Sequence, residues 1–264
     1  MARRRLDAEL VHRGLARSRE HAQTLVEEGR VVLGGVVATK SATQVDASSS
    51  IVVREGDDGP DYVSRGAHKL IGALDAFGLS VEGRRALDAG ASTGGFSDVL
   101  LRRGVSAVAA VDVGYGQLAW SVRSDPRVVV LDRTNVRDLV PELLPFVPDL
   151  VVADLSFISL ALVLPALVGV VTPDADLVLM VKPQFEVGRG QVGAGGVVRD
   201  PALRSEAVRR IAAAASDLGL GVAGVVASPL PGPSGNVEYF LHLRRGAEPL
   251  DESDLASAIE EGPK

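Results

Sequence analysis

The chain contains no cysteine among its 264 residues. This absence excludes disulfide bridges, thiolate metal sites and cysteine nucleophiles, and it favours the reducing environment of the cytoplasm. It also excludes methylation of pyrimidine C5 through a cysteine adduct. The four histidines show no metal-ligand spacing, so we predict no metal site.

Long hydrophobic runs are also missing. The longest, Leu155 to Val171, has 17 residues and is interrupted by serine and proline, whereas a membrane-spanning helix needs about 20. The start of the chain, Met1 to Asp7, is charged and lacks the apolar segment of a secretory signal. We therefore expect a cytoplasmic protein that does not bind membranes.

Excess positive charge is confined to the start of the chain. The net charge is −6, but residues 1–40 hold eight Lys and Arg residues against five Asp and Glu residues. An acidic chain can still carry a local basic face, and such a face is compatible with nucleic-acid binding.

Two domains are predicted from the length of the chain. Residues 1–56 show two short helical patterns, the second capped by Ser18, and a strand–turn–strand pattern over 31–37, which together predict a small α+β domain. Residues 57–63 are predicted to be a linker. Residues 64–264 form the second predicted domain.

Strand and helix patterns alternate along the second domain, which predicts a doubly wound, Rossmann-like α/β sheet of about seven strands. The expected strands are 85–88, 107–112, 128–132, 149–153, 177–182, 222–228 and 238–243. The expected helices are 64–77, 95–103, 117–124, 158–170, 201–218 and 249–260.

The most specific motif is a glycine turn between the first of these strands and the helix after it. It runs Asp88-Ala89-Gly90-Ala91-Ser92-Thr93-Gly94-Gly95-Phe96, and its glycines let a ligand approach the backbone and the helix N-terminus. Asp112, at the end of the next strand, suits a ribose diol. The phosphate-binding spacing G-x-G-x-x-G is absent and an acidic residue opens the loop. We therefore predict the cationic cofactor S-adenosylmethionine rather than a dinucleotide.

Polar residues end several predicted strands, where ligands of such sheets bind. Asp154 and Lys182 end two of them. Because lysine is rarely buried unpaired, we predict a Lys–Asp pair at this edge; a lysine that extends into solvent is the alternative. Lys69 and Glu238 could join the pair, although spacing alone does not show it. Asp132 also suits a turn or a helix cap.

Three further segments have both a functional and a structural interpretation. Arg133-Thr134-Asn135 follows the third strand, where an adenine would lie, but it also suits an ordinary polar turn. Phe157 could pack on the adenine, on a target base or in the core. The glycine-rich segment 188–196 could close over a substrate or be a disordered surface loop.

Several long motifs together resemble the hemolysin A (TlyA) family. The start of the chain, from Arg5 to Val31, resembles an S4 RNA-binding domain. The other matching segments are 63–70, 87–96, 112–118, 154–159, 181–186 and 234–239. The resemblance covers nearly the whole chain. It implies an S4 domain joined to an FtsJ-like methyltransferase, which methylates the cytidine ribose 2′-hydroxyl of ribosomal RNA. It further implies 16S and 23S rRNA, in the 30S and 50S subunits, as substrates, and sensitivity to capreomycin-type antibiotics as the phenotype.

The resemblance also implies functional residues. The Lys-Asp-Lys-Glu tetrad of FtsJ-like enzymes corresponds to Lys69, Asp154, Lys182 and Glu238. Together with the strand-end analysis, it predicts that S-adenosyl-L-methionine contacts Asp88, Gly90, Ala91, Ser92, Thr93, Gly94, Gly95, Phe96, Asp112, Val113, Arg133, Thr134, Asn135, Asp154 and Phe157. RNA is expected to contact Arg3, Arg4, Arg5, Arg17, Arg19 and Arg65.

The predicted mechanism centres on one lysine. Lys182 contacts the ribose 2′-oxygen and either stabilises the developing alkoxide or acts as the base, and Asp154 orients it. Lys69 and Glu238 position the ribose. Two other classes stay open at this point: a membrane-active hemolysin and a non-catalytic ribosome-binding factor. Amine methylation is disfavoured because 154–157 lacks the paired prolines of that class.

Overall fold

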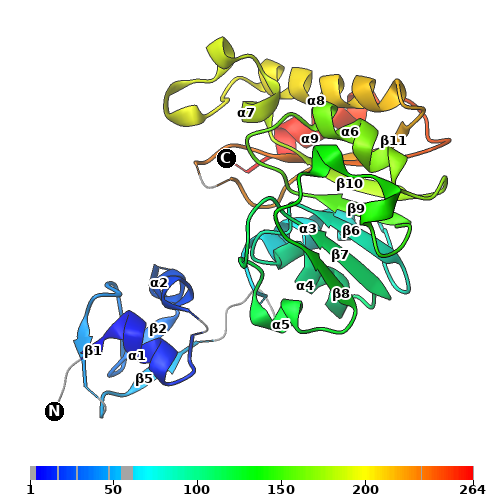
Figure 1. Ribbon diagram of the computed structural model, residues 1–264. Coiled ribbons are helices and arrows are strands. Elements are labelled where there is room, and N and C mark those ends of the chain that lie inside the picture. The colour runs from blue at the N-terminus through cyan, green and yellow to red at the C-terminus, as the bar shows by residue number, and fades with distance from the viewer. Residues whose placement is uncertain are drawn as a thin grey trace. The chain divides into compact units, whose positions relative to one another are not determined.

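The computed structural model describes residues 4–16, 18–27, 29–46, 48–54, 62–232 and 234–263. It divides the chain into two compact units, Met1–Asp61 and Tyr62–Lys264 (Figure 1). The first unit has one hydrophobic core, and the second has a core on each face of its central sheet.

The N-terminal unit is a small α+β domain. Leu6 and Leu10 lie one turn apart on the first helix and pack in the core against Leu25 of the second, as their spacing predicts. The backbone N–H of His21 donates to Ser18 Oγ at 3.0 Å, which confirms the predicted helix cap. The helices are α1 (Leu6–His12) and α2 (Arg19–Glu27). The strands, in sheets of order β1-β4 and β3-β2-β5, are β1 (Arg4–Arg5), β2 (Val31–Leu33), β3 (Val36–Val37), β4 (Gln44–Val45) and β5 (Ile51–Val53).

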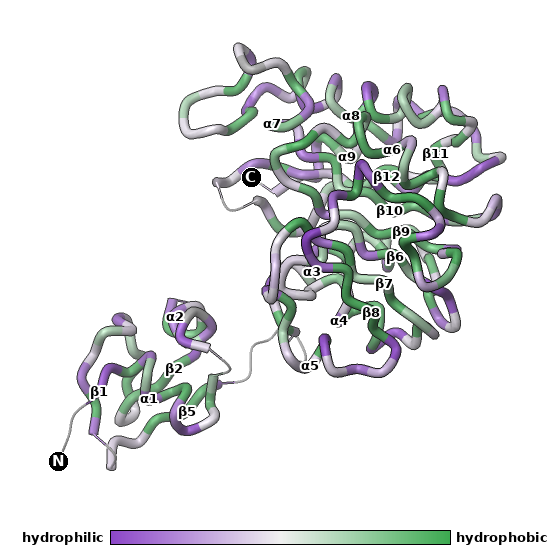
Figure 2. The backbone as a smooth tube through the Cα atoms, in the orientation of Figure 1, coloured by the Kyte–Doolittle hydropathy of each residue, from purple (hydrophilic) through white to green (hydrophobic). Residues whose placement is uncertain are grey.

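The second unit is built on a seven-stranded sheet of order β11-β12-β10-β9-β6-β7-β8. The strands are β6 (Arg85–Ala89), β7 (Ala107–Val111), β8 (Val128–Leu131), β9 (Leu150–Ala153), β10 (Asp176–Val181), β11 (Gly221–Ala227) and β12 (Tyr239–Arg244). Strands β6 to β10 are parallel, and β12 is antiparallel to both of its neighbours. The hydrophobic central strands, green in Figure 2, suit a sheet that is buried on both faces. All seven predicted strands are confirmed to within one residue at either end.

Helices cover both faces of this sheet, as predicted (Figure 1). One face packs against α3 (Gly66–Ala76), α4 (Gly95–Arg102) and α5 (Trp120–Arg123). The other packs against α6 (Leu160–Gly169), α8 (Pro201–Ser216) and α9 (Glu252–Glu261). The connections contain the short helices η1 (Val136–Asp138), η2 (Pro141–Leu143), α7 (Pro183–Glu186), η3 (Arg189–Gln191) and η4 (Ala194–Gly196).

Two details differ from the expected pattern. The helix predicted over 117–124 is reduced to the four residues of α5. Residues 117–119 are not helical: Ala119 has an extended ψ of 141°, and its N–H donates to the carbonyl oxygen of Thr93 at 3.0 Å. Tyr62 and Val63 fall in the predicted linker, yet they pack against the second unit. The N–H of Val63 donates to Asp98 Oδ2 at 2.9 Å, which ties the start of the unit to α4.

Candidate active site

Strand β12, which is antiparallel to its neighbours, brings two distant parts of the second unit to one edge of the sheet. Parallel strands β6, β9 and β10 all end at this edge. Because β12 runs in the opposite direction, it begins there, and its Tyr239 pairs with Val181 at the end of β10. Lys182 and Glu238 therefore both lie just beyond the paired ends of neighbouring strands.

Lys182 and Asp154 form the expected ion pair. Lys182 Nζ lies 2.5 Å from Asp154 Oδ1 and donates a hydrogen bond to Ser156 Oγ at 3.0 Å. Lys182 is only 8% exposed, so the alternative of a lysine that extends into solvent is wrong. Because its position is fixed, this ammonium group can place one positive charge beside a reacting atom.

Lys69 and Glu238 form a second buried ion pair, in which Lys69 Nζ donates to Glu238 Oε2 at 2.6 Å. Lys69 is 8% exposed and Glu238 is fully buried. Helix α3 reaches the segment after β11 because Gly72, one turn beyond Lys69, has no side chain. A Cβ atom on Gly72 would lie 2.7 Å from Pro229 Cγ. This close approach brings together two side chains that are 169 residues apart in the sequence.

The glycine turn lies beside the Lys182–Asp154 pair. The backbone of Gly90 has a φ of +89°, and a Cβ atom there would lie 2.7 Å from the carbonyl oxygen of Asp154. Only glycine allows this approach. Asp112 anchors the turn, because its Oδ2 accepts a hydrogen bond from the N–H of Ser92 at 2.8 Å. The cavity that results is lined by Ser64, Gly66, Gly90, Ala91, Ser92, Thr93, Gly95, Phe96 and Asp154.

Asp88 is fully buried where β6 meets the glycine turn. Its Oδ2 accepts a hydrogen bond from Ser97 Oγ at 2.7 Å, and no described residue donates one to its Oδ1. Burial, with the nearby negative charges of Asp154 and Asp112, raises the pKa of Asp88 to about 7. A buried carboxylate with an unused oxygen favours a ligand that carries positive charge.

The remaining predicted cofactor contacts lie on the loops after β7 and β8. The N–H of Thr134 donates to the carbonyl oxygen of Asp112 at 2.9 Å, which joins the two loops. The guanidinium of Arg133 lies 4.3 Å from the centre of the Tyr115 ring. Asn135 Oδ1 accepts from the N–H of Arg137 at 3.1 Å and caps η1. Val113, next to Asp112, is exposed.

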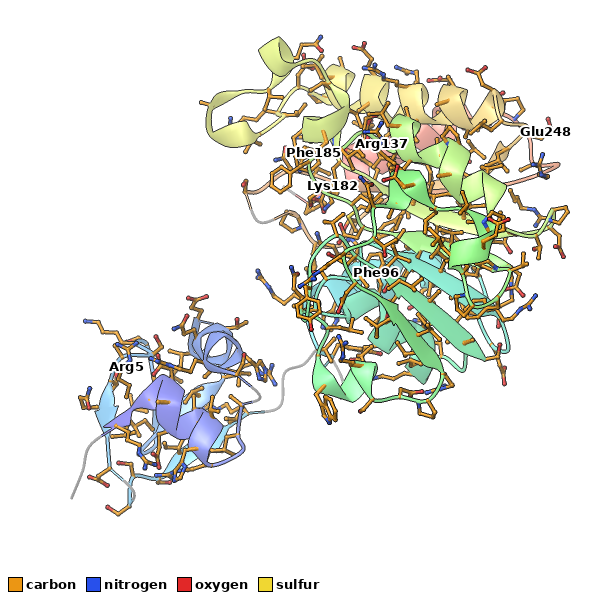
Figure 3. All side chains as sticks on the ribbon, in the orientation of Figure 1. Arg5, Phe96, Arg137, Lys182, Phe185 and Glu248 are labelled. Atoms are coloured by element: carbon orange, nitrogen blue, oxygen red, sulfur yellow. The ribbon has the colours of Figure 1, made fainter. Side chains whose placement is uncertain are left out.

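Phe157 is 91% exposed, so its core interpretation is wrong. Its ring lies 5.2 Å from that of Phe185, which follows Lys182 on α7 (Figure 3). Glu186 fixes the facing loops: it accepts hydrogen bonds from Ser159 Oγ at 2.5 Å and from the N–H of Leu160 at 2.8 Å. Sequence reasoning missed Ser156, Ser97 and Glu186. Ser156 lies in an irregular loop, and Ser97 and Glu186 lie in short helices where no pattern marks a polar residue as functional.

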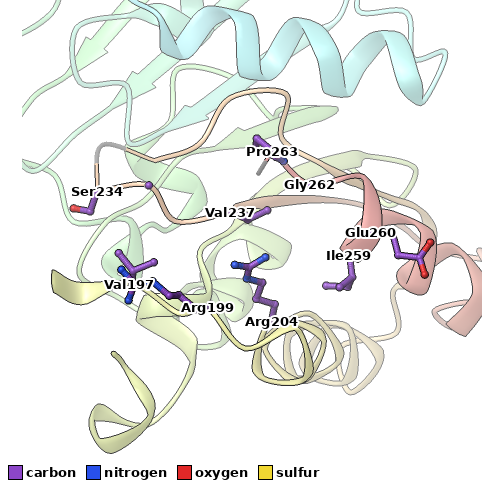
Figure 4. Close-up of a pocket in the computed structure, with 10 residues that line it drawn as sticks. Val197, Arg199, Arg204, Ser234, Val237, Ile259, Glu260, Gly262 and Pro263 are labelled. Carbon is purple, nitrogen blue, oxygen red and sulfur yellow. The ribbon is translucent and has the colours of Figure 1, made fainter. Parts of the chain in front are cut away.

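A larger cavity, of about 500 Å³, contains none of the predicted site residues (Figure 4). It is lined by Val197, Arg199, Arg204, Ser234, Gly235, Val237, Ile259, Glu260, Gly262 and Pro263. Beside it, Asn236 Nδ2 donates to the carbonyl oxygen of Gly196 and its Oδ1 accepts from the N–H of Val198. These bonds anchor the end of the glycine-rich segment 188–196, which contains η3 and η4.

The predicted RNA-contacting arginines are divided between the units. Arg4, Arg5 and Arg19 are exposed on the N-terminal unit, and Arg65 is exposed just before α3. Arg3 and Arg17 lie outside the described residues. Within the described ranges, no three His, Asp or Glu side chains are grouped to hold a metal ion. In the same part of the chain, no helix is long and apolar enough to cross a membrane.

The fold and the site define an FtsJ-like methyltransferase joined to an S4 domain. The FtsJ-like methyltransferase family matches residues 62–245, and the S4 domain family matches residues 4–51. S-adenosylmethionine is the cofactor of this class. The chain belongs to the TlyA family, since it is 60% identical over 270 residues to the 16S/23S rRNA (cytidine-2′-O)-methyltransferase TlyA of Mycobacterium tuberculosis, with 100% of both chains covered.

Two further relatives match nearly the whole chain. Hemolysin A of Brachyspira hyodysenteriae is 37% identical, with 90% of this chain and 99% of the relative covered. A solved structure described as a hemolysin from Streptococcus thermophilus is also 37% identical, has a TM-score of 0.77 and covers 99% of this chain and 97% of its own. The resemblance expected from the motifs is thus confirmed.

Proposed function

We propose that this protein transfers a methyl group from S-adenosylmethionine to the 2′-hydroxyl of a cytidine in ribosomal RNA. The observation that carries the proposal is the pair of buried lysine–carboxylate contacts, Lys182–Asp154 and Lys69–Glu238, at the edge of the sheet beside the glycine turn. The name of the 60% identical relative specifies the same reaction. Because that relative acts on 16S and 23S rRNA, we propose both subunits as substrates here, with capreomycin sensitivity as the phenotype.

The residues around the glycine turn suit the cofactor. Asp88 offers a buried carboxylate oxygen to positive charge, Gly90 leaves the backbone accessible, and Asp112 has further lone pairs for a ribose diol. We assign the lining of this cavity and the loops carrying Val113, Arg133 to Asn135 and Phe157 to cofactor binding. When bound, the cofactor supplies an electrophilic methyl group.

The side chains must activate a poor nucleophile, because a ribose hydroxyl loses its proton only far above pH 7. Lys182 Nζ contacts the 2′-oxygen and stabilises the negative charge that develops as the hydroxyl proton passes to solvent water. Asp154 and Ser156 fix that ammonium group in place. Lys69 and Glu238 would position the ribose so that its 2′-oxygen faces the methyl group that the cofactor supplies.

The S4 domain supplies placement on the ribosome. Its exposed arginines neutralise phosphates, which gives a salt-dependent affinity with little sequence information. Selection of one cytidine then depends on the shape of the RNA and on extrusion of the base. We expect this reaction in the cytoplasm, where ribosomal subunits are assembled.

The test is to incubate the full-length protein with tritiated S-adenosylmethionine and unmodified 30S or 50S subunits, and to map the label by mass spectrometry of nuclease fragments. Label on a cytidine ribose supports the proposal, and its distribution decides between one subunit and two. If cofactor binds but neither subunit is labelled, the proposal is wrong and the protein is a ribosome-binding factor. Leakage from liposomes on adding detergent-free protein would instead favour the hemolysin interpretation.

A further inference from the structure

One carboxylate in the N-terminal unit is surrounded by arginines from separate elements. Asp7, on α1, is fully buried. Its Oδ2 lies 2.8 Å from the terminal nitrogen Nη2 of Arg5, on β1, and 3.1 Å from Nη2 of Arg19, on α2. Two guanidinium groups that share one oxygen atom must lie side by side.

The two arginines remain accessible although the acid does not. The side chain of Arg5 is 43% exposed and that of Arg19 is 59% exposed. Asp7 occupies Nε and Nη2 of Arg5 and only Nη2 of Arg19. Since a guanidinium has five N–H donors, the contacts with Asp7 leave further donors on both side chains.

We propose that Asp7 is a positioning residue, which holds Arg5 and Arg19 together as a preformed site for one phosphodiester group of RNA. The inference rests on the proposed function, in which the S4 domain binds ribosomal RNA. It adds a buried acid to the RNA-binding residues, although an acid by itself repels phosphate.

The physical reason is preorganisation. An unrestrained arginine loses up to about 2 kcal/mol of rotamer entropy when it is fixed against a ligand. Asp7 fixes both side chains before RNA arrives, so less entropy is lost on binding. The hydrogen bond from Arg5 holds the pKa of Asp7 well below its usual range, so the acid stays ionised at neutral pH.

A charge-neutralising substitution at Asp7 gives the test, because two explanations predict opposite changes in affinity for RNA. Asp7→Asn makes the domain more positive by one charge. If the acid only weakens the basic face, RNA binds more tightly. If Asp7 positions the arginines, we expect affinity for 30S and 50S subunits to fall on the order of tenfold. The slope of log affinity against log salt concentration should also become shallower by about one, which corresponds to the loss of about one phosphate contact.

Two variants control for charge and for folding. Glu27→Gln makes the same charge change at an exposed position on α2, and it should leave affinity unchanged or slightly raised. Arg19→Lys keeps Asp7 and the total charge but replaces the planar fork by a point charge, so it should also weaken binding, even if Asp7→Asn does not fold. Circular dichroism and cofactor binding of the full chain report folding of each variant.

Three results would overturn the inference. The first is Asp7→Asn that folds and binds subunits as tightly as the unaltered protein, or more tightly. The second is Arg19→Lys with undiminished affinity. The third is a loss of subunit affinity on Arg19→Ala that is equally large in the unaltered protein and in Asp7→Asn, since positioning requires the effects of the two residues to be coupled. Absence of subunit binding by the unaltered protein would contradict the proposed function itself, and the inference with it.

Discussion

Asp7 and Glu9 in the S4 domain pair with exposed arginines, whereas Asp154 and Glu238 in the methyltransferase domain pair with buried lysines. Asp7 and Glu9 are almost inaccessible. Arg5 and Arg4 beside them are about half exposed, and Arg13, which also pairs with Glu9, is 24% exposed. Where β10 ends and β12 begins, the side chains of Lys69 and Lys182 are 11% and 10% exposed, against 1% for Glu238 and 25% for Asp154. The first arrangement leaves a broad, flat cation accessible to solvent. The second places a compact charge where water is largely excluded.

This difference follows from the chemistry of the two cations. A guanidinium is weakly hydrated and offers a planar fork that suits phosphate, while an ammonium is a strongly hydrated point charge. Burial of the ammonium loses much of that hydration, so the carboxylate partner must replace it. The comparison therefore predicts large losses from unpairing a lysine and smaller ones from altering exposed pairs.

The largest expected effect is at Lys182. Replacement by Met keeps the approximate length of the side chain but removes the charge next to the 2′-oxygen. We expect the methylation rate to fall on the order of 10²–10³-fold, because the stabilisation of negative charge on the 2′-oxygen is lost. Single-turnover methylation of ribosomal subunits measures the rate, and equilibrium assays should show cofactor and RNA binding retained.

Ser156→Ala provides the graded control for that experiment, because it removes one of the two groups that hold Lys182 Nζ. It should retain much more activity than Lys182→Met. An unchanged rate in Lys182→Met would remove this lysine from the mechanism.

The second effect concerns stability. Lys69→Met leaves the buried carboxylate of Glu238 unpaired, and we expect the free energy of unfolding to fall by about 3–5 kcal/mol. Adding Glu238→Gln should restore part of this loss, because no buried charge is then left alone. Urea unfolding of both single variants and the double variant gives the coupling free energy between Lys69 and Glu238.

An exposed pair in the same domain calibrates the measurement. Arg209 Nη2 lies 2.7 Å from Glu252 Oε2, and the two side chains are 51% and 62% exposed. Arg209→Met should cost less than about 1 kcal/mol. Equal losses at Lys69 and Arg209 would show that burial does not distinguish the two kinds of pair.

The third expected effect depends on pH. Because the pKa of Asp88 is raised to about 7 from an unfolded value of 3.8, the folded state keeps a proton that the unfolded state has lost. Stability should therefore decrease as pH rises, by about 2–3 kcal/mol between pH 5 and pH 7. Asp88→Asn should remove this part of the pH dependence, as measured by urea unfolding across that range.

Cofactor affinity should show the opposite trend. Ionised Asp88 attracts a cationic ligand, so binding of S-adenosylmethionine should strengthen as pH rises through about 7. In Asp88→Asn the affinity should be lower and nearly independent of pH. Tight binding by this variant at pH 8 would show that Asp88 makes no electrostatic contribution to the cofactor site.

The sequence predicts the strands well because each is a short apolar run bounded by polar turns. It also predicts the Lys182–Asp154 pair, since lysine at the end of a buried strand needs a partner. It does not predict the Lys69–Glu238 pair from spacing, because that contact joins residues 169 apart and depends on the strand order. The family resemblance supplied those two residues.

Other features of the site depend on geometry that has no local signal. Ser156 lies in a loop and Glu186 ends the four-residue helix α7, which is too short for a periodic pattern, and their roles appear only when neighbouring strand ends meet. The burial of Asp7 likewise follows from the packing of α1 beside β1 and α2. Its sequence neighbourhood, rich in arginine, indicates only an exposed basic surface.

The position of β12 has a consequence for the order of synthesis. This strand comes last in the sequence but lies inside the sheet, between β10 and β11. A ribosome releases the S4 domain first, so a nascent chain can carry its arginines long before Glu238 is available to Lys69. Such a chain can contact RNA but has no complete catalytic edge. In the proposed mechanism, activity therefore begins only when the final strand has been inserted.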